Sequence, residues 1–483
     1  MFMRLANLGG IEEIDSGRRW EPPVLAENAA RRATALRERG ISRRARVALV
    51  EPSDADFFAD LLAVWTAGAT AACLDPALTA SELGIVLDFL HPAAVLARGR
   101  PLPAGPWVAF EPIETTGSHP ASALPMPDPA DPALIMFTSG TTGQPKGVLL
   151  SFGALQARIA ANAAAMGDAA RMRTLVTLPT HFGHGLIGNA LTPLLSGGTI
   201  VLPPTGSLLA KELGRIIDAY RIGFMSSVPA LWRMALKLGS GPTTAALSRV
   251  HVGSAPLSGR LWSDIAAWAR CEVVNCYGMT ETANWFAGAS SRDGIEDGLV
   301  GRPWEGAVAV AADDGTIRPS GEGEILVRTA GLMAGYLDRP DLTAAVIRDG
   351  WYHTGDRGRV DAERSIRLTG RIKDEINRAG FKVQPAELDT LLETHPDVAE
   401  ACAFALPDPI GGEAVAAAVR LEPGAALRAE ELRAWCRERL RREAVPEYWY
   451  IVSSLPRSAR GKINRDALRE LLVSKGPPCS LQK

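Results

Sequence analysis

Short apolar runs alternate with helix-length segments through much of the first part of this 483-residue chain. The runs at 46–50 and 69–74 have the composition of buried strands, and the segments Ser53–Gly68 and Thr79–Leu90 have helical patterns opened by polar caps. Five further runs, TLVTL, TIVL, GFMSSV, RVHV and CEVVN, continue the alternation. Such alternation is typical of βαβ units, so we predict an α/β fold whose layers are built on parallel sheet.

The pattern changes after about residue 300, where shorter strand-like pieces predominate. A run of charged residues at 370–383 then precedes a stretch with the pattern of a small α+β unit. We therefore expect a large domain with a β-rich last part and a small mobile domain. The expected boundaries are 1–370 for the N-terminal domain, 371–373 for a hinge and 374–483 for the C-terminal domain. The elements expected in the C-terminal domain are helices near Pro385–Thr394 and 427–442 and strands near 398–406 and 413–421.

The formal net charge of −2 gives no electrostatic argument for binding nucleic acid or an anionic membrane. The longest apolar stretch, Leu61–Leu74, is too short to span a bilayer, and the N-terminus lacks the continuous apolar segment of a secretory signal. The 6 cysteines form no CxxC pair, which is typical of free thiols in a reducing compartment. We expect a cytoplasmic protein with no nucleic-acid or membrane partner.

The stretch FTSGTTGQPKGV at 137–148 crowds glycines, hydroxyls and one lysine behind a short apolar run. Glycines let backbone N–H groups approach phosphate oxygens, hydroxyls donate further hydrogen bonds, and lysine adds a point charge. The order differs from the common P-loop, because Lys146 is followed by Gly147 and Val148 rather than by Ser or Thr. An ordinary glycine-rich turn is the alternative. The candidate phosphate-binding residues are Thr138, Ser139, Gly140, Thr141, Thr142, Gly143 and Lys146.

Three later segments place polar side chains after strand-like runs or in loops. In NCYGMTET, Tyr277 offers a ring for a base, Gly278 allows close approach, and Glu281 offers a carboxylate for Mg²⁺ beside a phosphate site. In WYHTGD, Asp356 could accept two hydrogen bonds from a ribose diol, and Lys462 lies in a glycine-flanked basic loop. Taken singly, each segment is explained as well by an ordinary turn or a solvated loop.

Together, these segments resemble, in sequence and in order, the motifs of the adenylate-forming superfamily. This superfamily includes acyl- and aryl-CoA synthetases, luciferases and the adenylation domains of nonribosomal peptide synthetases. FTSGTTGQPKGV resembles its phosphate loop, YGMTE its adenine-and-magnesium motif, and GEGEILVR, GYLDRP and WYHTGD its next motifs. GRIKDEINRAGFKVQPAELD resembles the hinge motif, and the GK of PRSARGKINRDAL the catalytic-lysine motif. The resemblance covers nearly the whole chain and implies ATP-dependent formation of an acyl-adenylate with release of pyrophosphate.

The resemblance also implies a role for each matching residue. The glycine-rich stretch would bind the β- and γ-phosphates of ATP, and Glu281 would hold the magnesium ion. Lys462 would bridge the substrate carboxylate and the α-phosphate, which is fixed-charge stabilisation of an in-line displacement. The ATP site would further include Asn275 and Tyr277 at adenine, Gly278, Thr280 at a phosphate, and Asp356 and Arg371 at the ribose.

The small C-terminal domain of this family swings between two poses about one hinge residue, which Lys373 matches here. In one pose Lys462 would enter the site, and in the other the loop around Gly380 would shape a tunnel for the second nucleophile. A glycine suits this position because a side chain would narrow the tunnel. The implied catalytic residues are therefore Lys462, Thr280, Glu281 and Gly380.

One segment departs from the family pattern. Many relatives have a histidine where LPTHFGHGLIG has Phe182, and here His181 and His184 lie on either side of it. Two histidines in a glycine loop could suggest a metal, but no neighbouring Cys, Asp or third His supports one. We expect them to line the acid or acceptor pocket, where a histidine could act as a base, or to be packed rings. Further pocket walls implied by the resemblance are Phe224–Pro229, Gly253, Ser254 and Ala255, with Trp285 and Phe286 as additional candidates, and they indicate an apolar or aromatic acid.

The leading interpretation is an acid–thiol ligase with coenzyme A as acceptor, because GFKVQPAELD resembles the CoA-ligase and luciferase version of its motif. In a second interpretation an amine attacks the adenylate and gives an amide. A third transfers the acyl group to a carrier protein, although no carrier domain is expected in the twenty or so residues after Lys462. A nucleotide-binding regulator is the non-enzymatic alternative, and the presence of Lys462, Glu281 and Asp356 argues against it. Luciferase-type oxygen chemistry is remote.

Overall fold

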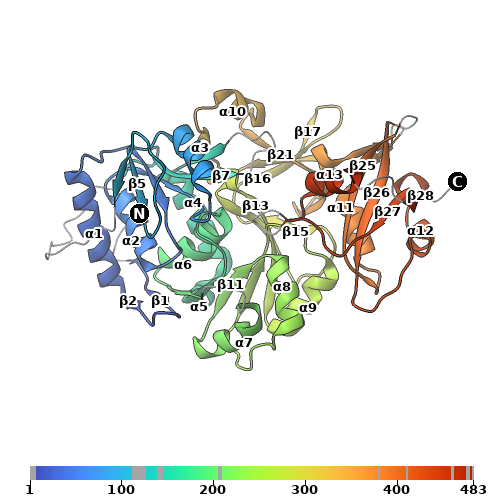
Figure 1. Ribbon diagram of the computed structural model, residues 1–483, viewed down its shortest axis with the longest axis horizontal. Helices are drawn as coiled ribbons and strands as arrows, with labels where there is room; N and C mark the ends of the chain where they lie inside the picture. Colours follow the sequence, from blue (N-terminus) through green and yellow to red (C-terminus); the bar gives the residue numbers. More distant parts are fainter. Residues whose placement is uncertain are drawn as a thin grey trace.

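The computed structural model has the mixed α/β architecture that the alternation predicted (Figure 1). Two sheets and their helices form a large body at the left and centre of Figure 1, and a third sheet forms a smaller C-terminal unit at its right. The structure describes residues 7–110, 127–138, 145–204, 209–378, 381–408, 412–457, 462–474 and 479–480. No helix in these ranges has both the length and the apolar character needed to cross a bilayer.

The first sheet carries the parallel strands of the opening βαβ units. β3 (Arg46–Val50) lies between β4 (Thr70–Cys73) and β5 (Ala94–Ala97), and the three strands run parallel. The full order is β19-β8-β7-β4-β3-β5-β6, and the last two pairings on the β19 side are antiparallel. Its other strands are β6 (Val108–Phe110), β7 (Pro132–Thr138), β8 (Lys146–Ser151) and β19 (Gly335–Tyr336), and its helices are α1 (Pro22–Glu38), α2 (Ala55–Thr66), α3 (Ala80–Leu90) and α4 (Phe152–Met166).

Polar residues cap α2 and α3, α3 at the predicted Thr79 and α2 one residue after the predicted Ser53. Asp54 Oδ1 accepts a hydrogen bond from the backbone N–H of Phe57 at 2.9 Å, and Thr79 forms a capping box with Glu82. These contacts satisfy N–H groups that the first helical turn leaves without internal partners. The local sequence therefore sets the start of both helices.

The second sheet has 15 strands, with a parallel part and an antiparallel part. β1, β10, β9, β11, β12 and β13 run parallel, and the strands from β14 onward pair in antiparallel fashion. Its strands are β1 (Ile11–Glu13), β2 (Arg19–Trp20), β9 (Arg173–Val176), β10 (Thr199–Leu202), β11 (Phe224–Ser227), β12 (Arg249–Val252), β13 (Glu272–Met279), β14 (Asn284–Ser290), β15 (Leu299–Pro303), β16 (Ala307–Ala311), β17 (Ile317–Arg318), β18 (Gly321–Arg328), β20 (Ile347–Arg348), β21 (Trp351–Val360) and β22 (Ile366–Arg371). The helices beside it are α5 (Asp168–Arg171), the π-helix η2 (His184–Leu191), α6 (Thr192–Leu194), α7 (Leu209–Ala219), α8 (Pro229–Leu238), α9 (Gly259–Ala269), the 3₁₀ turn η3 (Thr280–Thr282) and α10 (Pro340–Val346).

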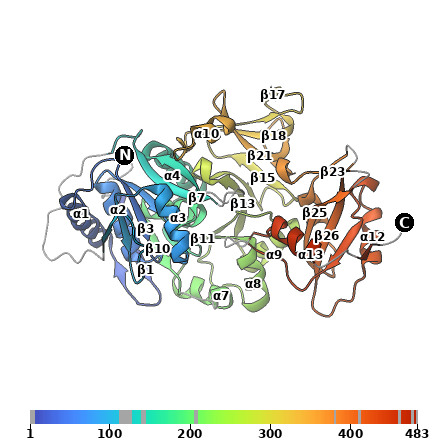
Figure 2. The ribbon, with the colours of Figure 1, turned by 45° about the horizontal axis from the view of Figure 1, so that its top comes forward.

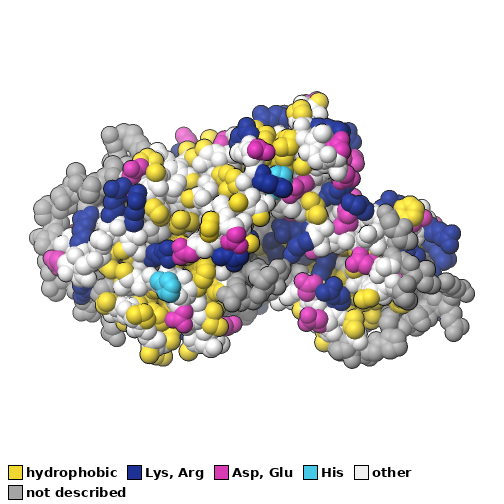
Figure 3. Space-filling view, turned by 90° about the horizontal axis from the view of Figure 1, so that it is seen from above, with side chains coloured by type: hydrophobic (Ala, Val, Ile, Leu, Met, Phe, Trp, Pro, Cys, Tyr) yellow, Lys and Arg dark blue, Asp and Glu magenta, His cyan; other side chains and the backbone are white. Residues whose placement is uncertain are grey.

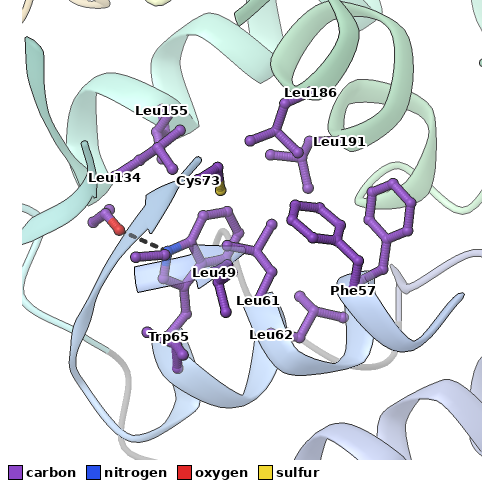
Figure 4. Close-up of a cluster of buried hydrophobic side chains, with 14 of the residues drawn as sticks. Leu49, Phe57, Leu61, Leu62, Trp65, Cys73, Leu134, Leu155, Leu186 and Leu191 are labelled. Atoms are coloured by element: carbon purple, nitrogen blue, oxygen red, sulfur yellow. Dashed lines mark hydrogen bonds between the residues drawn. The ribbon is translucent and has the colours of Figure 1, made fainter. Parts of the chain in front are cut away.

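A buried apolar cluster joins α2 to the first sheet and to η2 (Figure 4). Trp65 is 1% exposed, and its indole Nε1–H donates a hydrogen bond to Ala133 O at 2.8 Å. Leu49 of β3 and Leu186 and Leu191 of η2 belong to the same cluster. Full burial of each large apolar side chain contributes about 1.5–3 kcal/mol. The cluster therefore fixes η2, whose first residue lines the candidate site.

The C-terminal unit contains a six-stranded sheet in the order β24-β23-β26-β27-β28, with β25 paired to β26. The expected helix at 427–442 is too long, because α12 ends at Arg437 and the turn after it lets Leu440 pack against two separate clusters. The strands of the unit are β23 (Ile376–Arg378), β24 (Phe381–Val383), β25 (Val398–Asp408), β26 (Gly412–Leu421), β27 (Tyr448–Ile451) and β28 (Cys479–Ser480). Its helices are η4 (Ile372–Asp374), α11 (Pro385–Leu392), α12 (Ala429–Arg437), η5 (Arg442–Ala444) and α13 (Arg465–Ser474).

The C-terminal unit contacts the large body beside α8 (Figure 2), and α11 of this unit contacts β22. Arg233 of α8 and Glu393, just after α11, approach to 2.7 Å. A Cβ atom on Gly370 would lie 2.2 Å from Gln384 Oε1, so this glycine permits the close approach of β22 to the segment before α11. Figure 3 shows the surface indented between the two parts, with Lys and Arg side chains along the indentation.

Candidate functional site

A buried carboxylate, Asp356, is held by two donors from different strands. It lies opposite Arg371 in the β21–β22 register, and Arg371 Nε is 2.9 Å from its Oδ1. The hydroxyl of Tyr277, on β13, donates to Asp356 Oδ2 at 2.7 Å. Burial, and then the charge of Asp356, raise the pKa of Tyr277 well above its ordinary value, so the phenol keeps its proton. The structure thus brings together three residues that the resemblance placed at adenine and ribose.

A second polar group joins the two sheets of the large body. Tyr336, on β19, donates its hydroxyl to Glu281 Oε1 at 2.8 Å. The amine of Lys146, the first residue of β8, lies 3.6 Å from the centre of the Tyr336 ring. Burial lowers the pKa of Lys146, and the charge of Glu281 opposes that shift, so the two charges are near enough to interact. Thr280 and Glu281 share the turn η3. An amine and a carboxylate are therefore presented side by side.

The glycine-rich stretch connects two antiparallel strands of one hairpin, since Thr138 of β7 pairs with Lys146 of β8. This differs from the strand-to-helix connection of the common P-loop and explains why Lys146 begins a strand rather than a helix. The expectation that the stretch binds phosphate stays a prediction. Ser139, Gly140, Thr141, Thr142 and Gly143 lie outside the described residues, as does the side chain of Thr138.

Asn275 and Gly278 have structural partners in β13. The side-chain amide of Asn275 donates to Leu299 O at 2.8 Å, which ties β13 to the start of β15. A Cβ atom on Gly278 would lie 2.1 Å from Asn284 O, and the β13–β14 register shifts at this point. Gly278 therefore permits the close approach of β14 to β13 at this point. Contacts of either residue with a nucleotide remain predictions.

His184 opens the π-helix η2 and is held by two serines. Its Nε2 lies 2.6 Å from Ser226 Oγ and its Nδ1 lies 2.8 Å from Ser254 Oγ. Because Ser226 donates its proton to His251 O, the network assigns the His184 proton to Nε2, and Ser254 donates to Nδ1. Burial, and then the charge of Lys462, lower the pKa of His184 to about 3. With both nitrogens occupied, this residue is poorly suited to act as a base.

The other two residues of the altered segment have different surroundings. His181 Nε2 lies 3.5 Å from Asp75 Oδ2, and the rings of His181 and Phe182 meet edge to face at 4.1 Å. The hypothesis that a histidine serves as a base therefore favours His181 over His184. Within the ranges that the structure describes, no group of three or more His, Cys, Asp and Glu side chains could hold a metal ion.

Aromatic side chains form the wall behind His184. The ring of Trp285 lies 5.2 Å from that of His184, 4.7 Å from that of His251 and 6.4 Å from that of Phe224. Trp304 packs against the same group, whereas Phe286 belongs to a different cluster with Tyr277. His251 and Trp304 were not predicted, because a lone histidine in an apolar strand and a tryptophan in a later loop carry no local signal. We refer to Phe224, His251, Trp285 and Trp304 as the aromatic wall.

The remaining predicted residues are Gly253, Ala255, Lys462, Lys373 and Gly380. A Cβ atom on Gly253 would lie 3.7 Å from His184 Cε1, and Ala255 follows Ser254 in the turn after β12. Lys462 comes from the C-terminal unit, and its charge reaches His184. Lys373 is exposed in η4, where β22 leaves the large body. Gly380 lies outside the described residues.

Comparison with known proteins assigns the chain to a family. The family model of AMP-binding enzymes matches residues 14–337, and that of the AMP-binding enzyme C-terminal domain matches residues 387–462. The chain belongs to the AMP-binding enzyme family. The resemblance to the adenylate-forming superfamily is thus confirmed, and the chain is a ligase of this family.

Its relatives in the AMP-binding family include ligases with different acids and acceptors. An oxalate–CoA ligase from Arabidopsis thaliana is 30% identical over 482 residues, covering 93% of this chain and 92% of its own length. A 2-succinylbenzoate–CoA ligase from Geobacillus kaustophilus is 32% identical, and the match covers 95% of this chain and 94% of that ligase. The solved structure of the amide bond synthetase McbA from Marinactinospora thermotolerans has a TM-score of 0.85 at 26% identity, and the match covers 97% of this chain and 98% of McbA.

Proposed function

We propose that this ligase uses ATP to convert an apolar or aromatic carboxylic acid to an acyl-adenylate and then transfers the acyl group to the thiol of coenzyme A. The observation that carries the proposal is the electrostatic interaction of Lys462 with His184. This lysine belongs to the C-terminal unit, yet its charge acts on His184 in the large body. A cation there would steady a substrate carboxylate beside the aromatic wall.

The two polar groups of the large body fit the nucleotide. Asp356 would accept hydrogen bonds from the ribose, with Tyr277 and Arg371 fixing its orientation. Lys146 would contact phosphate oxygens, together with Thr280 and the glycine-rich stretch. Glu281 would hold Mg²⁺, since one carboxylate plus phosphates and water is a usual shell for this ion. The bound ion would supply charge stabilisation to the phosphates during attack by the carboxylate.

The acid attacks the α-phosphorus with one carboxylate oxygen, and pyrophosphate leaves with the electron pair of the broken P–O bond. Lys462 would oppose the negative charge that builds on the α-phosphate, and the enclosed site would keep water from the adenylate. For the second step, rotation about Lys373 would remove Lys462 and bring the segment around Gly380 to the site. The thiolate of the acceptor would then attack the acyl carbon and release AMP.

Coenzyme A is the leading acceptor because relatives that match nearly the whole length of the chain are named as CoA ligases. An amine is the second candidate, supported by the similarity to an amide bond synthetase. A carrier protein is the third, since a dimodular nonribosomal peptide synthase from Bacillus subtilis is 29% identical over 467 residues, although that match covers 19% of its length.

Acid-dependent ATP–pyrophosphate exchange tests the first step, and addition of coenzyme A or amines to active wells tests the second. Lys462→Ala should raise the activation free energy of adenylate formation by about 3 kcal/mol, the cost of losing one positioned donor. It should spare transfer from supplied acyl-adenylate. Gly380→Leu should block coenzyme A transfer and spare exchange. If no acid supports exchange, the chain would instead be a nucleotide-binding regulator.

A further inference from the structure

Three buried polar side chains in and beside the aromatic wall have no hydrogen-bond partner among the described residues. They are His251 with both ring nitrogens, Trp285 with its indole Nε1–H and Asn284 with its amide Nδ2. Their exposed fractions are 0%, 2% and 7%. Because an unsatisfied buried polar group costs about 1–3 kcal/mol, such groups need an explanation in terms of water or a ligand.

These groups lie together and next to His184. The rings of His251 and Trp285 are 4.7 Å apart, and the ring of Trp285 is 5.2 Å from that of His184. A Cβ atom on Gly188 would lie 2.1 Å from Asn284 Nδ2 and 2.9 Å from the Trp285 ring, so η2 packs directly over both residues. Asn284 also has a φ of 89°, a backbone conformation that costs free energy in a non-glycine residue. The unsatisfied atoms therefore form one group beside His184.

The group is neutral and rich in donors. Burial, and then the positive charge of Arg249, lower the pKa of His251 well below its ordinary value, so this ring is uncharged at neutral pH. Its neutral ring offers one donor, and the indole and the amide offer only donors at the unsatisfied atoms. Arg249 is itself paired with Glu272 at 2.7 Å. A second carboxylate on the acid would have to lose its hydration among aromatic rings, a cost that a neutral acceptor avoids.

We propose that the aromatic wall selects aromatic monocarboxylic acids that carry a neutral hydrogen-bond acceptor, such as a ring nitrogen or a carbonyl, away from the carboxylate. The inference rests on the proposed function, which places the acid beside His184. His251 and Trp285 are the specificity-determining residues, and Phe224 and Trp304 supply apolar contact. An acid of the same shape without the acceptor leaves these donors unpaired, which is how a polar site rejects an apolar analogue.

Pyrophosphate exchange with pairs of similarly shaped acids tests the proposal on the full-length enzyme. The pairs are 2-naphthoate against quinoline carboxylates with the nitrogen at different ring positions, and 4-isopropylbenzoate against 4-acetylbenzoate. In each pair, an acid with an acceptor should have a kcat/KM about tenfold higher, which corresponds to one satisfied hydrogen bond. His251→Phe and Trp285→Phe should bring each pair near parity and leave the KM for ATP unchanged.

A matched control comes from the opposite face of the sheet. Trp232 of α8 also has a buried indole Nε1 without a partner in the described part of the chain, but it packs with Trp268 in a different cluster. Trp232→Phe should therefore leave the preference for acceptor-bearing acids unchanged. His251→Asn, which keeps a neutral donor, should retain part of that preference and provides a second variant if His251→Phe does not fold.

The outcomes separate this inference from the proposed function. Equal kcat/KM values within every pair, or a preference for the dianion terephthalate, would overturn the selectivity and leave adenylation intact. Absence of exchange with every acid would overturn the proposed function itself. Preserved selectivity in folded His251→Phe and Trp285→Phe enzymes would show that other residues recognise the acceptor.

Discussion

The ion pair between Arg233 and Glu393 determines part of the free energy of the observed domain orientation. Its nitrogen and oxygen are 2.7 Å apart, and the side chains are 28% and 14% exposed. Burial raises the pKa of Glu393, and Arg233 is the first group that opposes this shift. Fully buried pairs cost about 3–5 kcal/mol when one partner is removed, and exposed pairs contribute up to about 1 kcal/mol. We therefore expect this pair to stabilise the observed orientation by about 1–2 kcal/mol, which is a factor of roughly 5–30 in the equilibrium between orientations.

Charge reversal and restoration test this value. Arg233→Glu places two carboxylates together, so the observed orientation should lose population by roughly 5–30-fold. Energy transfer between dyes on the large body and the C-terminal unit measures that population, and stopped-flow assays measure the two half-reactions. Adenylate formation should slow while transfer from supplied adenylate does not. The double variant Arg233→Glu with Glu393→Arg should recover the population of the observed orientation and the rate of adenylate formation. Arg215→Glu, which breaks an exposed pair with Glu212 within α7, serves as the control.

Two results would refute this reasoning. If the double variant did not recover the dye distance, the loss in Arg233→Glu would come from local damage to α8 rather than from the ion pair. If both half-reactions slowed equally, the observed orientation would not be specific to adenylate formation.

Three further predictions concern the site. Tyr277→Phe removes the hydroxyl that donates to Asp356 at 2.7 Å, and since hydrogen bonds to charged groups contribute about 1.5–3 kcal/mol, the KM for ATP should rise while that for the acid does not. An unchanged KM for ATP would separate Asp356 from nucleotide binding. Glu281→Gln keeps the size and loses the charge, so adenylation should fall roughly a hundred- to a thousandfold, and near-normal rates at limiting magnesium would exclude Glu281 as the ligand. His184 has a folded-state pKa of about 3, whereas in the unfolded chain it takes up a proton near pH 6.5. Its contribution to stability therefore falls as pH decreases from 6.5 toward 3, by about 1.4 kcal/mol at pH 5.5. Denaturant unfolding of the wild type and of His184→Asn at pH 7.5 and 5.5 measures this difference, and equal pH dependence in both would contradict it.

Elements with local signals were predictable from the sequence. Polar caps at Asp54 and Thr79 set the starts of α2 and α3, and alternating apolar runs correctly indicated parallel strands. The end of α12 was not predictable in this way, because Leu440 leaves the helix to contact two clusters formed by distant residues. Tertiary packing decides such boundaries, and the pattern within one segment carries no information about packing against distant residues.

In the candidate site, too, the sequence indicated some residues, whereas their contacts are known only from the fold. The family motifs indicated Asp356 and Arg371, but only the β21–β22 register shows that they face each other. Tyr336 was not predicted to contact Glu281, since its position depends on the pairing of β19 with β8, far apart in sequence. His251 had no detectable signal, because burial in a strand and a missing partner are both properties of the folded chain.

The position of the proposed nucleotide site between two sheets has a consequence for how the large body unfolds. Lys146 and Tyr336 belong to the first sheet, and Glu281 lies between two strands of the second. A nucleotide held by all three would cross-link the two sheets in addition to the apolar cluster that they share. At a concentration of 100 times its dissociation constant, a ligand adds about 2.7 kcal/mol to the free energy of unfolding. That energy is lost as soon as either sheet opens, so ATP should raise the melting temperature of both sheets together and protect both from proteolysis.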